Sequence, residues 1–238
     1  PIQLKESYRW IDCIRSTKEL LENQEIVMVY DREGDIHEVY DAAIESGIDV
    51  VIRSQHNRRL ENDLRLEELV ALEKVRGKHR VNIPGSGGRK GRVAELDVRF
   101  KKVVLSSCPS GQVTRRNKGR SEIELTVVDA TELKGDLSWR LLTTLPVDDL
   151  KSAKEVLNYY KMRWQVEIYF KTLKTGCTVE DCCLGEASKL VKYNSLMSVV
   201  AWRLYWMSFM SREDGGICCE KTLMPSEWKT AWLMLHRN

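Results

Sequence analysis

Apolar and polar positions alternate in a way that predicts a strand–helix–strand unit in the first quarter of the chain. A helical period over about residues 5–22 precedes the run QEIVMVYDREGD, a short apolar strand that ends abruptly in charge. A helix is expected over about residues 35–46, because Gly47 suits the position just beyond a helix C-terminus. The run IDVVIRS then predicts a second strand. Two strands joined by a helix indicate a partly parallel sheet.

Asp31 stands at the carboxyl end of the first predicted strand. In open sheets with parallel strands, binding and catalytic residues collect at the carboxyl ends of the strands. The position of Asp31 therefore marks it as a candidate for chemistry before any motif is considered.

The pattern changes over residues 57–136, where strands predominate. A short helical piece near residues 64–72 is followed by three runs that read as strands: HRVNI, VAELDVRFKKVVL and SEIELTVVDA. Two loops rich in glycine and basic residues separate them: PGSGGRKG and CPSGQVTRRNKGR. This arrangement predicts an all-β insertion.

The chain then returns to mixed structure. WRLLTTL reads as a strand, Asp148 is a candidate N-cap for a helical region that runs to Thr175, and a further helix is expected over about residues 187–210. We therefore predict four segments: a first part of an α/β core (1–56), the basic β-rich insertion (57–136), a second part of the core (137–213) and a C-terminal tail (214–238).

Charge is unevenly distributed along the chain. The formal net charge of the 238 residues is +3, but residues 74–120 hold 14 Lys and Arg against two acids, a net +12. This asymmetry indicates either an anionic partner for the segment or a solvated basic face.

Other features narrow the class of protein. The seven cysteines have no zinc-like spacing, so reduced thiols and a cytoplasmic location are expected. The longest apolar stretch, residues 190–210, is interrupted by Lys192, Asn194 and Arg203. We therefore expect a buried core helix and no membrane span. The chain begins at Pro1 rather than Met, which suggests a fragment.

The most informative stretch is YKMRWQVEIYFKTLKTG. At about 100° per residue, one face of a continuous helix carries five polar residues: Tyr160, Arg163, Glu167, Lys171 and Lys174. The opposite side, with Met162 and Val166, would be buried. One carboxylate among cations suits a site for metal and phosphate. Spacing alone is more typical of ordinary surface ion pairs between residues four apart.

The spacing Tyr160-x2-Arg163-x3-Glu167-x6-Lys174 resembles the YREK signature of the insertion-sequence-four family of bacterial DDE transposases, which includes the transposon-five transposase. Further segments resemble the family in the expected order: VYDREGDIHEVY, VVIRSQHNRR, WRLLTTLPV, LKTGCTVED, VVAWRLYWM and LMPSEWKTAW. The resemblance covers nearly the whole chain. It implies a ribonuclease H-like core, a mixed sheet with flanking helices, interrupted by an all-β insertion.

The resemblance also implies a mechanism. Two divalent cations, normally Mg²⁺ with Mn²⁺ as a substitute, would be held by an Asp-Asp-Glu triad for phosphoryl transfer on DNA. Asp31 and Glu167 match two of the three ligands. The first aspartate of the family lies upstream of the segment resembling KESYRW, so we expect this chain to lack it, to be cut short at both ends and to be inactive alone.

Other residues take roles from the same resemblance. Five would bind phosphate or DNA: Arg53, Tyr160, Arg163, Lys171 and Lys174. Trp139, and with it Trp164, would stack around a flipped base during hairpin formation. The expected partners are transposon ends and target DNA in the bacterial nucleoid, with a homodimer on paired ends in the full-length protein.

Two alternatives stay open. The chain could be a DNA-binding remnant of a transposase that folds but cannot cut. It could also be a different ribonuclease H-like nuclease, a class that the YREK spacing disfavours.

Overall fold

The structure, a computed structural model, describes residues 8–60, 63–83, 90–106, 122–213 and 215–236. The chain divides into two compact units, Pro1–Arg163 and Trp164–Asn238. Each unit is described by itself.

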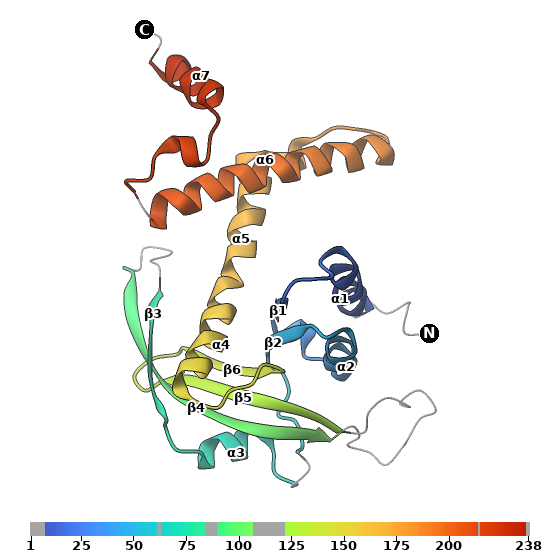
Figure 1. The fold of residues 1–238 in the computed structure, drawn as a ribbon, viewed down its shortest axis with the longest axis vertical. Coiled ribbons are helices and arrows are strands. Elements are labelled where there is room, and N and C mark those ends of the chain that lie inside the picture. Colours follow the sequence, from blue (N-terminus) through green and yellow to red (C-terminus); the bar gives the residue numbers. More distant parts are fainter. Residues whose placement is uncertain (1–7, 61–62, 84–89, 107–121, 214, 237–238) are drawn as a thin grey trace. The chain divides into compact units, whose positions relative to one another are not determined.

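The first unit is built on one six-stranded sheet (Figure 1). Its strands are β1 (Val27–Tyr30), β2 (Asp49–Arg53), β3 (Gly77–Ile83), β4 (Arg92–Ser106), β5 (Glu122–Glu132) and β6 (Ser138–Thr143), in the spatial order β1-β2-β6-β5-β4-β3. β1 and β2 pair in parallel, and the other neighbours pair antiparallel. The sheet is therefore mixed, and the expectation of an α/β class with a partly parallel sheet is confirmed.

Helices cover both faces of this sheet (Figure 1). They are α1 (Tyr8–Leu20), α2 (His37–Ser46), α3 (Leu66–Leu72) and α4 (Leu150–Met162). The first three contribute to one buried cluster, for example Ile14, Tyr40 and Leu66 with Ile52 of β2. A second cluster, the α4-side cluster, contains Val51, Val81, Ala94, Leu96, Val98, Val128, Ala130, Leu141, Val147, Ala153, Val156, Leu157 and Tyr160.

The predicted end of the helix before Gly47 is confirmed. α2 ends at Ser46, and Gly47 follows with φ 62°, the left-handed conformation that glycine adopts at low cost.

The N-cap of α4 differs from the prediction. It is Asp149, whose carboxylate accepts a hydrogen bond from Ser152 N at 2.7 Å. Asp148, the predicted cap, instead lies 3.3 Å from Lys102 Nζ.

A separate all-β insertion is not confirmed. β3, β4 and β5 belong to the same sheet as β1, β2 and β6, and α3 also falls between residues 57 and 136. The register from Leu96↔Glu132 to Ser106↔Glu122 joins β4 to β5, and β5 pairs in turn with β6. The ribonuclease H-like core and the four predicted segments stay predictions.

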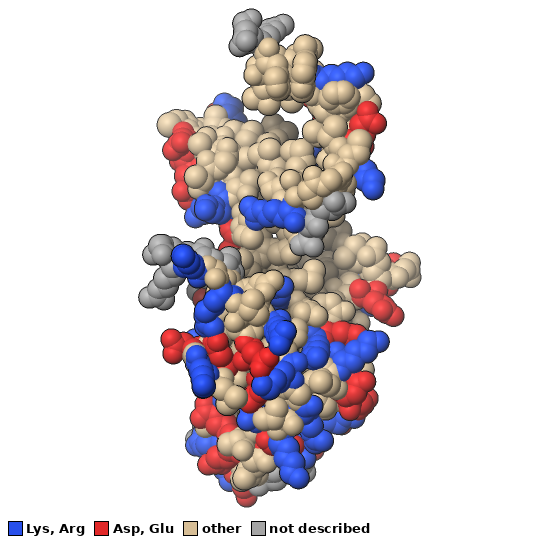
Figure 2. All heavy atoms as spheres, turned by 90° about the vertical axis from the view of Figure 1, so that its left-hand side faces the viewer, with Lys and Arg blue, Asp and Glu red and all other residues tan. Residues whose placement is uncertain are grey.

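Many cations of the basic segment are paired with carboxylates. Six of its described cations form ion pairs: Arg76, Lys78, Arg80, Arg92, Lys101 and Lys102. Figure 2 shows Lys and Arg intermingled with Asp and Glu on the visible face of this unit. Most of the two predicted basic loops, residues 84–89 and 107–121, lies outside the described residues. The net +12 is thus partly offset where the structure describes it.

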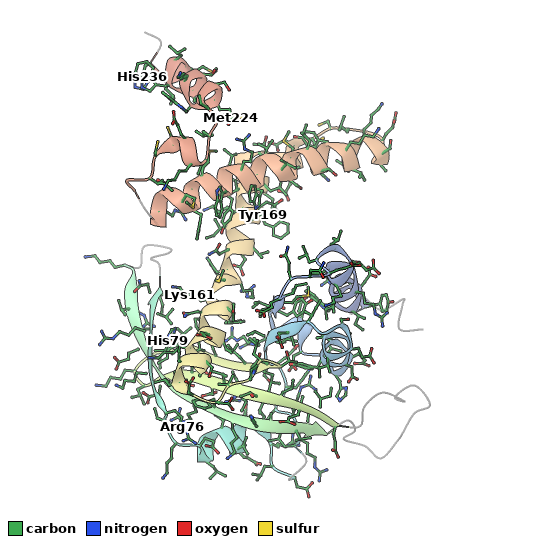
Figure 3. All side chains as sticks on the ribbon, viewed as in Figure 1. Arg76, His79, Lys161, Tyr169, Met224 and His236 are labelled. Carbon is green, nitrogen blue, oxygen red and sulfur yellow. The ribbon has the colours of Figure 1, made fainter. Side chains whose placement is uncertain are left out.

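The second unit is helical. It contains α5 (Trp164–Lys171), a π-helical turn (Thr172–Gly176), α6 (Ala187–Glu213) and α7 (Pro225–Leu235). Tyr169 of α5 (Figure 3) donates a hydrogen bond to Ser198 O of α6 at 3.3 Å. Arg203 of α6 binds Glu227 of α7 through both guanidinium Nη atoms, at 2.7 and 2.8 Å. These hydrogen bonds lower the pKa of Glu227 to about 2.

The prediction that residues 190–210 form a buried helix is wrong for this unit. In α6, Val191 is 65% and Leu196 61% exposed, and Ala201 is its one buried hydrophobic residue among those described. Polar and apolar residues are mixed around this 27-residue helix, so it has no single apolar face to bury. Among the described residues, no helix is both long and apolar enough to span a membrane.

Candidate functional site

Asp31 directly follows β1, as predicted. Its carboxylate accepts a hydrogen bond from Glu33 N at 3.0 Å and so caps a short 3₁₀ turn, Arg32–Gly34. Within the described residues, the second carboxylate oxygen has no hydrogen-bond partner. Asp31 is thus held by its own turn while keeping one oxygen for a ligand.

Arg53 lies beside this turn at the carboxyl end of β2. β1 and β2 pair in parallel with Tyr30 opposite Ile52, so Asp31 and Arg53 follow on adjacent strands at one edge of the sheet. Arg53 Nη2 donates a hydrogen bond to Ser138 O at the start of β6, at 2.9 Å. The structure therefore brings together two residues that the sequence assigned to the active-site region.

Alternation along the strands places these two side chains toward α4. Val29 of β1 and Val51 of β2 both pack in the α4-side cluster. Residues two apart in a strand project to the same face. Asp31 and Arg53 follow Val29 and Val51 by two residues, so the α4 face of the sheet carries the candidate site.

Three more predicted residues meet on this face. The rings of Trp139 and Tyr160 lie edge to face, with centroids 5.4 Å apart. Arg163 places its Cζ atom 5.9 Å from the centroid of the Tyr160 ring, which is within cation–π range. Trp139 stands two residues before Leu141, the partner of Arg53 in the β2–β6 register. The first unit thus groups Arg53, Trp139, Tyr160 and Arg163 near the edge that bears Asp31.

The position of Tyr160 corrects the predicted polar stripe. Its side chain is 5% exposed and belongs to the α4-side cluster rather than to a solvated face. Packing against Trp139, 21 residues earlier on another strand, accounts for the burial. Met162 and Val166, predicted to be buried, are 57% and 52% exposed. A uniform helical wheel therefore misplaces both sides of this segment.

The remaining predicted residues belong to the second unit. Trp164, Glu167 and Lys171 are exposed on α5. Lys174 lies in the π-helical turn and its Nζ is 3.0 Å from Glu180 Oε1. Because a π turn has more residues per turn than an α-helix, Lys174 leaves the 3.6-residue period on which the predicted stripe rested.

A further basic group lies between β3 and α4 and was not singled out from the sequence. Burial and the nearby charges of Lys154 and Lys161 lower the pKa of His79 (Figure 3). Neither lysine has an ion-pair partner among the described residues. Lys161 lies beside Arg163 at the C-terminal end of α4, whereas Lys154 lies near the beginning of the helix.

Asp35 is a second residue that sequence reasoning passed over. It is 2% exposed and forms an ion pair with Arg58, with Nη2 2.7 Å from Oδ1. The available signal was a second aspartate in DREGD together with an arginine just after the second strand.

The donor chemistry suits a hard divalent cation, because carboxylate oxygens are the preferred ligands of Mg²⁺. Asp31 supplies one such carboxylate in the first unit and Glu167 one in the second. Within the part of the chain that the structure describes, no three His, Cys, Asp or Glu side chains form a metal-binding group.

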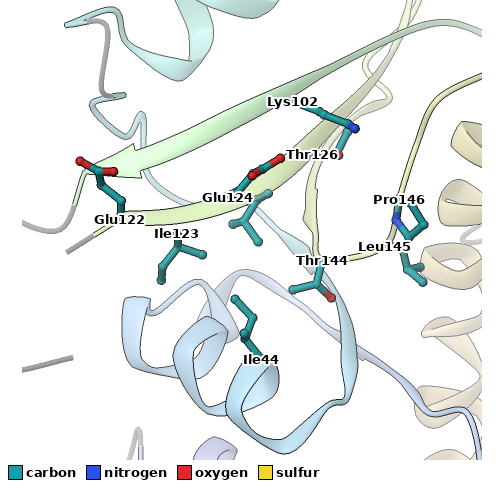
Figure 4. A pocket seen from close by; sticks show the side chains of 10 residues that line it. Ile44, Lys102, Glu122, Ile123, Glu124, Thr126, Thr144, Leu145 and Pro146 are labelled. Atoms are coloured by element: carbon teal, nitrogen blue, oxygen red, sulfur yellow. The ribbon is translucent and has the colours of Figure 1, made fainter. Parts of the chain in front are cut away.

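A cavity of about 520 Å³ lies elsewhere on the first unit (Figure 4). Ile44 of α2, Glu124 of β5, and Thr144 just beyond β6 line it, with Lys102 of β4. Thr144 follows the end of β6, whereas Trp139 is near its beginning. The cavity is therefore at the opposite edge of the sheet from the candidate site.

Replacing Gly34 with alanine should destabilise the turn that carries Asp31. An added Cβ would lie 2.6 Å from Tyr30 Cβ, so the turn or the strand end must shift. We expect a loss of about 1–3 kcal/mol in the free energy of unfolding of the first unit, measured by amide hydrogen exchange. Gly185→Ala, where an added Cβ meets open space, is the control. Equal stability of Gly34→Ala and wild type would contradict the tight packing of this turn.

Comparison with known families matches most of the sequence to a family model. The sequence model described as Transposase DDE domain matches residues 9–196. The chain belongs to the transposase DDE domain family. Transposase DDE domains generally use divalent metal ions and act on DNA. The match includes Asp31 at the sheet edge and Glu167 on α5.

Individual relatives also carry the name of transposase. The chain is 34% identical over 105 residues to InsL, a protein described as a transposase of insertion sequence element IS186A in Escherichia coli K12. It has the same identity to the transposase of insertion sequence element IS421 in Escherichia coli. Each match covers 42% of this chain and 26% of the relative. The matched part of this chain therefore corresponds to about a quarter of the length of these relatives.

Proposed function

We propose that this chain carries part of the DNA-cutting and DNA-joining site of a cut-and-paste transposase of the insertion-sequence-four, YREK-signature type. The observation that carries the proposal is the grouping of Asp31, Arg53, Trp139, Tyr160 and Arg163 in the first unit. Membership of the transposase DDE domain family supports it.

Asp31 and Glu167 would hold the divalent ions, with Mg²⁺ as the expected metal and Mn²⁺ as a substitute. When bound, such ions polarise the phosphoryl oxygen and lower the pKa of an attacking water or 3′-hydroxyl. The role of the chain is to present the carboxylates. Asp31 does so from a turn fixed by its own cap, with one oxygen left unpaired among the described residues.

Cations on the same segments of the chain as the two carboxylates would bind DNA phosphates. Arg163 offers a planar guanidinium that can bind a terminal phosphate through two hydrogen bonds, and Lys171 and Lys174 offer compact ammonium groups. Arg53 lies at the end of β2 beside Asp31. The ring of Tyr160 is buried, so any phosphate contact by this residue rests on its hydroxyl group.

Trp139 is suited to support an extruded base. Its ring is partly buried against Tyr160, which fixes its orientation while leaving part of its surface accessible. Stacking on an aromatic ring offsets part of the cost of unstacking a base. Trp164, 55% exposed at the start of α5, is the second candidate for this role. A homodimer on paired transposon ends would complete the assembly.

A test is the preference of the chain for DNA with a terminal phosphate. Wild type should bind a duplex with a terminal phosphate more tightly than the same duplex ending in a hydroxyl. Arg163→Ala should remove about tenfold or more of this preference, because a hydrogen bond to a charged group contributes about 1.5–3 kcal/mol. Fluorescence anisotropy with both duplexes measures it.

Lys189→Ala is the matched control, since Lys189 is an exposed cation paired with Glu186 in the second unit. It should lower affinity for both duplexes equally or not at all. If Arg163→Ala lowers the affinity for both duplexes by the same factor, Arg163 contributes only a general electrostatic attraction to DNA. The chain is then better described as a DNA-binding remnant of a transposase.

A further inference from the structure

The Asp35 carboxylate is saturated with hydrogen bonds although its side chain is fully buried. Its Oδ1 accepts from Tyr40 Oη at 3.0 Å and from two nitrogens of Arg58, Nε at 3.0 Å and Nη2 at 2.7 Å. Its Oδ2 accepts from Gln55 N at 2.7 Å and His56 N at 3.2 Å, and lies 3.4 Å from Ser54 Oγ, whose hydroxyl has a closer acceptor in His56 O at 3.0 Å. Arg58 Nη2 also donates to the backbone oxygen of Asp35 at 2.6 Å.

This saturation separates the roles of the two aspartates in DREGD. A carboxylate whose two oxygens together accept five hydrogen bonds and whose side chain is 0% exposed has no lone pair directed to solvent. Asp31 is partly exposed and keeps one oxygen without a partner among the described residues. Asp35 is therefore unsuited to bind a metal ion, and Asp31 is suited to do so.

The partners of Asp35 come from the segment that follows the neighbouring strand. Asp35 closes the turn after β1, where its N–H donates to Arg32 O at 3.2 Å. Residues 54–58 follow β2, and Ser54 N donates to Arg140 O of β6 at 2.8 Å. The carboxylate thus ties the segment bearing Asp31 to the segment that begins at Arg53.

We infer that Asp35, held by Arg58, is a positioning residue that fixes Asp31 beside Arg53 for binding a divalent cation. The inference deepens the proposed function and rests on it, because it takes Asp31 to be a metal ligand. Groups that orient a metal ligand change metal affinity by about 10–100-fold when removed. The effect of Asp35 reaches Asp31 through the 3₁₀ turn Arg32–Gly34, so we expect a change in affinity at the lower end of that range.

The test measures Mn²⁺ binding to the whole chain by electron paramagnetic resonance of the free ion. Specific binding is the part that Asp31→Asn removes. Asp35→Asn should lower this specific affinity about tenfold. Arg58→Lys keeps the positive charge but loses the planar fork, so it should lower the affinity less. Arg58→Lys also tests the positioning role if Asp35→Asn fails to fold.

Asp129→Asn is the matched control. Asp129 is another buried aspartate paired with an arginine, since its Oδ1 accepts from Arg140 Nε at 3.2 Å and its side chain is 3% exposed. It should lower the melting temperature as Asp35→Asn does while leaving Mn²⁺ affinity unchanged. Melting curves recorded on every variant separate loss of fold from loss of positioning.

The outcomes distinguish the inference from its basis. If Asp31→Asn leaves Mn²⁺ binding unchanged, the metal assignment fails and the inference fails with it. If Asp31→Asn removes binding but the Asp35 and Arg58 variants bind Mn²⁺ like wild type at temperatures where they are folded, only the positioning role is overturned. Equal losses of affinity in Asp35→Asn and Asp129→Asn would also overturn it.

Discussion

Replacing Glu167 with glutamine should abolish DNA cleavage by the full-length protein. Glutamine keeps the shape of the side chain but removes the negative charge that would hold a divalent cation. Metal ions contribute several kcal/mol to stabilising charge in such transition states, so we expect the cleavage rate to fall by about 10³-fold or more. Gel analysis of transposon-end cleavage in Mg²⁺ measures the rate.

The same variant should bind transposon ends about as tightly as wild type, because Arg163, Lys171 and Lys174 are unchanged. Glu186→Gln is the matched control, an exposed glutamate of the same unit paired with Lys189. It should cut at the wild-type rate. Cleavage by Glu167→Gln within a few-fold of wild type would remove Glu167 from the metal site.

Replacing Asp35 with alanine should cost the first unit about 3–5 kcal/mol in free energy of unfolding. The change removes the carboxylate that pairs with the Arg58 guanidinium, whose side chain is only 17% exposed. It also removes the acceptor of the N–H groups of Gln55 and His56. Breaking one side of a buried ion pair typically carries a cost of that size. Hydrogen exchange of the amides in β2 and β6 reports the free energy for this unit.

A double variant sharpens the test of this pair. Asp35→Ala with Arg58→Met removes both charges, so it should lose less stability than Asp35→Ala alone. If the double variant loses the sum of the two single losses, the two side chains stabilise the fold independently. Loss below about 1 kcal/mol for Asp35→Ala would contradict the hydrogen-bond network itself.

The features that could be predicted from the sequence are those set by local signals. The abrupt change from VMVY to charge marks the end of β1 and therefore the place of Asp31. Gly47 marks the end of α2 because a left-handed residue is needed there. Both signals lie within a few residues of the element that they define, so no long-range contact is needed to interpret them.

The features that were missed depend on contacts between distant residues. Tyr160 is buried because Trp139 of β6 packs against it, and a helical wheel contains no information about β6. Asp35 and Arg58 are 23 residues apart, and only the parallel pairing of β1 and β2 brings their segments together. β3–β5 extend the main sheet because β5 pairs with β6. Strand composition predicts strands but not their partners.

The helical signature itself shows where periodicity fails. The spacing Tyr160, Arg163, Glu167, Lys174 was assumed to run along one continuous α-helix. Arg163 has right-handed helical dihedral angles between α4 and α5, whereas Lys174 lies in a π turn, outside the α-helical period. The spacing is therefore misleading where it is taken as one unbroken α-helical pattern.

The most direct test of the proposal that Asp31 and Glu167 bind divalent cations is a crystal structure with Mn²⁺ and DNA that ends in a terminal phosphate. Anomalous scattering locates the ions independently of the protein. We expect Mn²⁺ peaks contacted by carboxylate oxygens of Asp31 and of Glu167, with Arg163 on the phosphate. Peaks held by other side chains, with Asp31 or Glu167 away from them, would contradict the proposal.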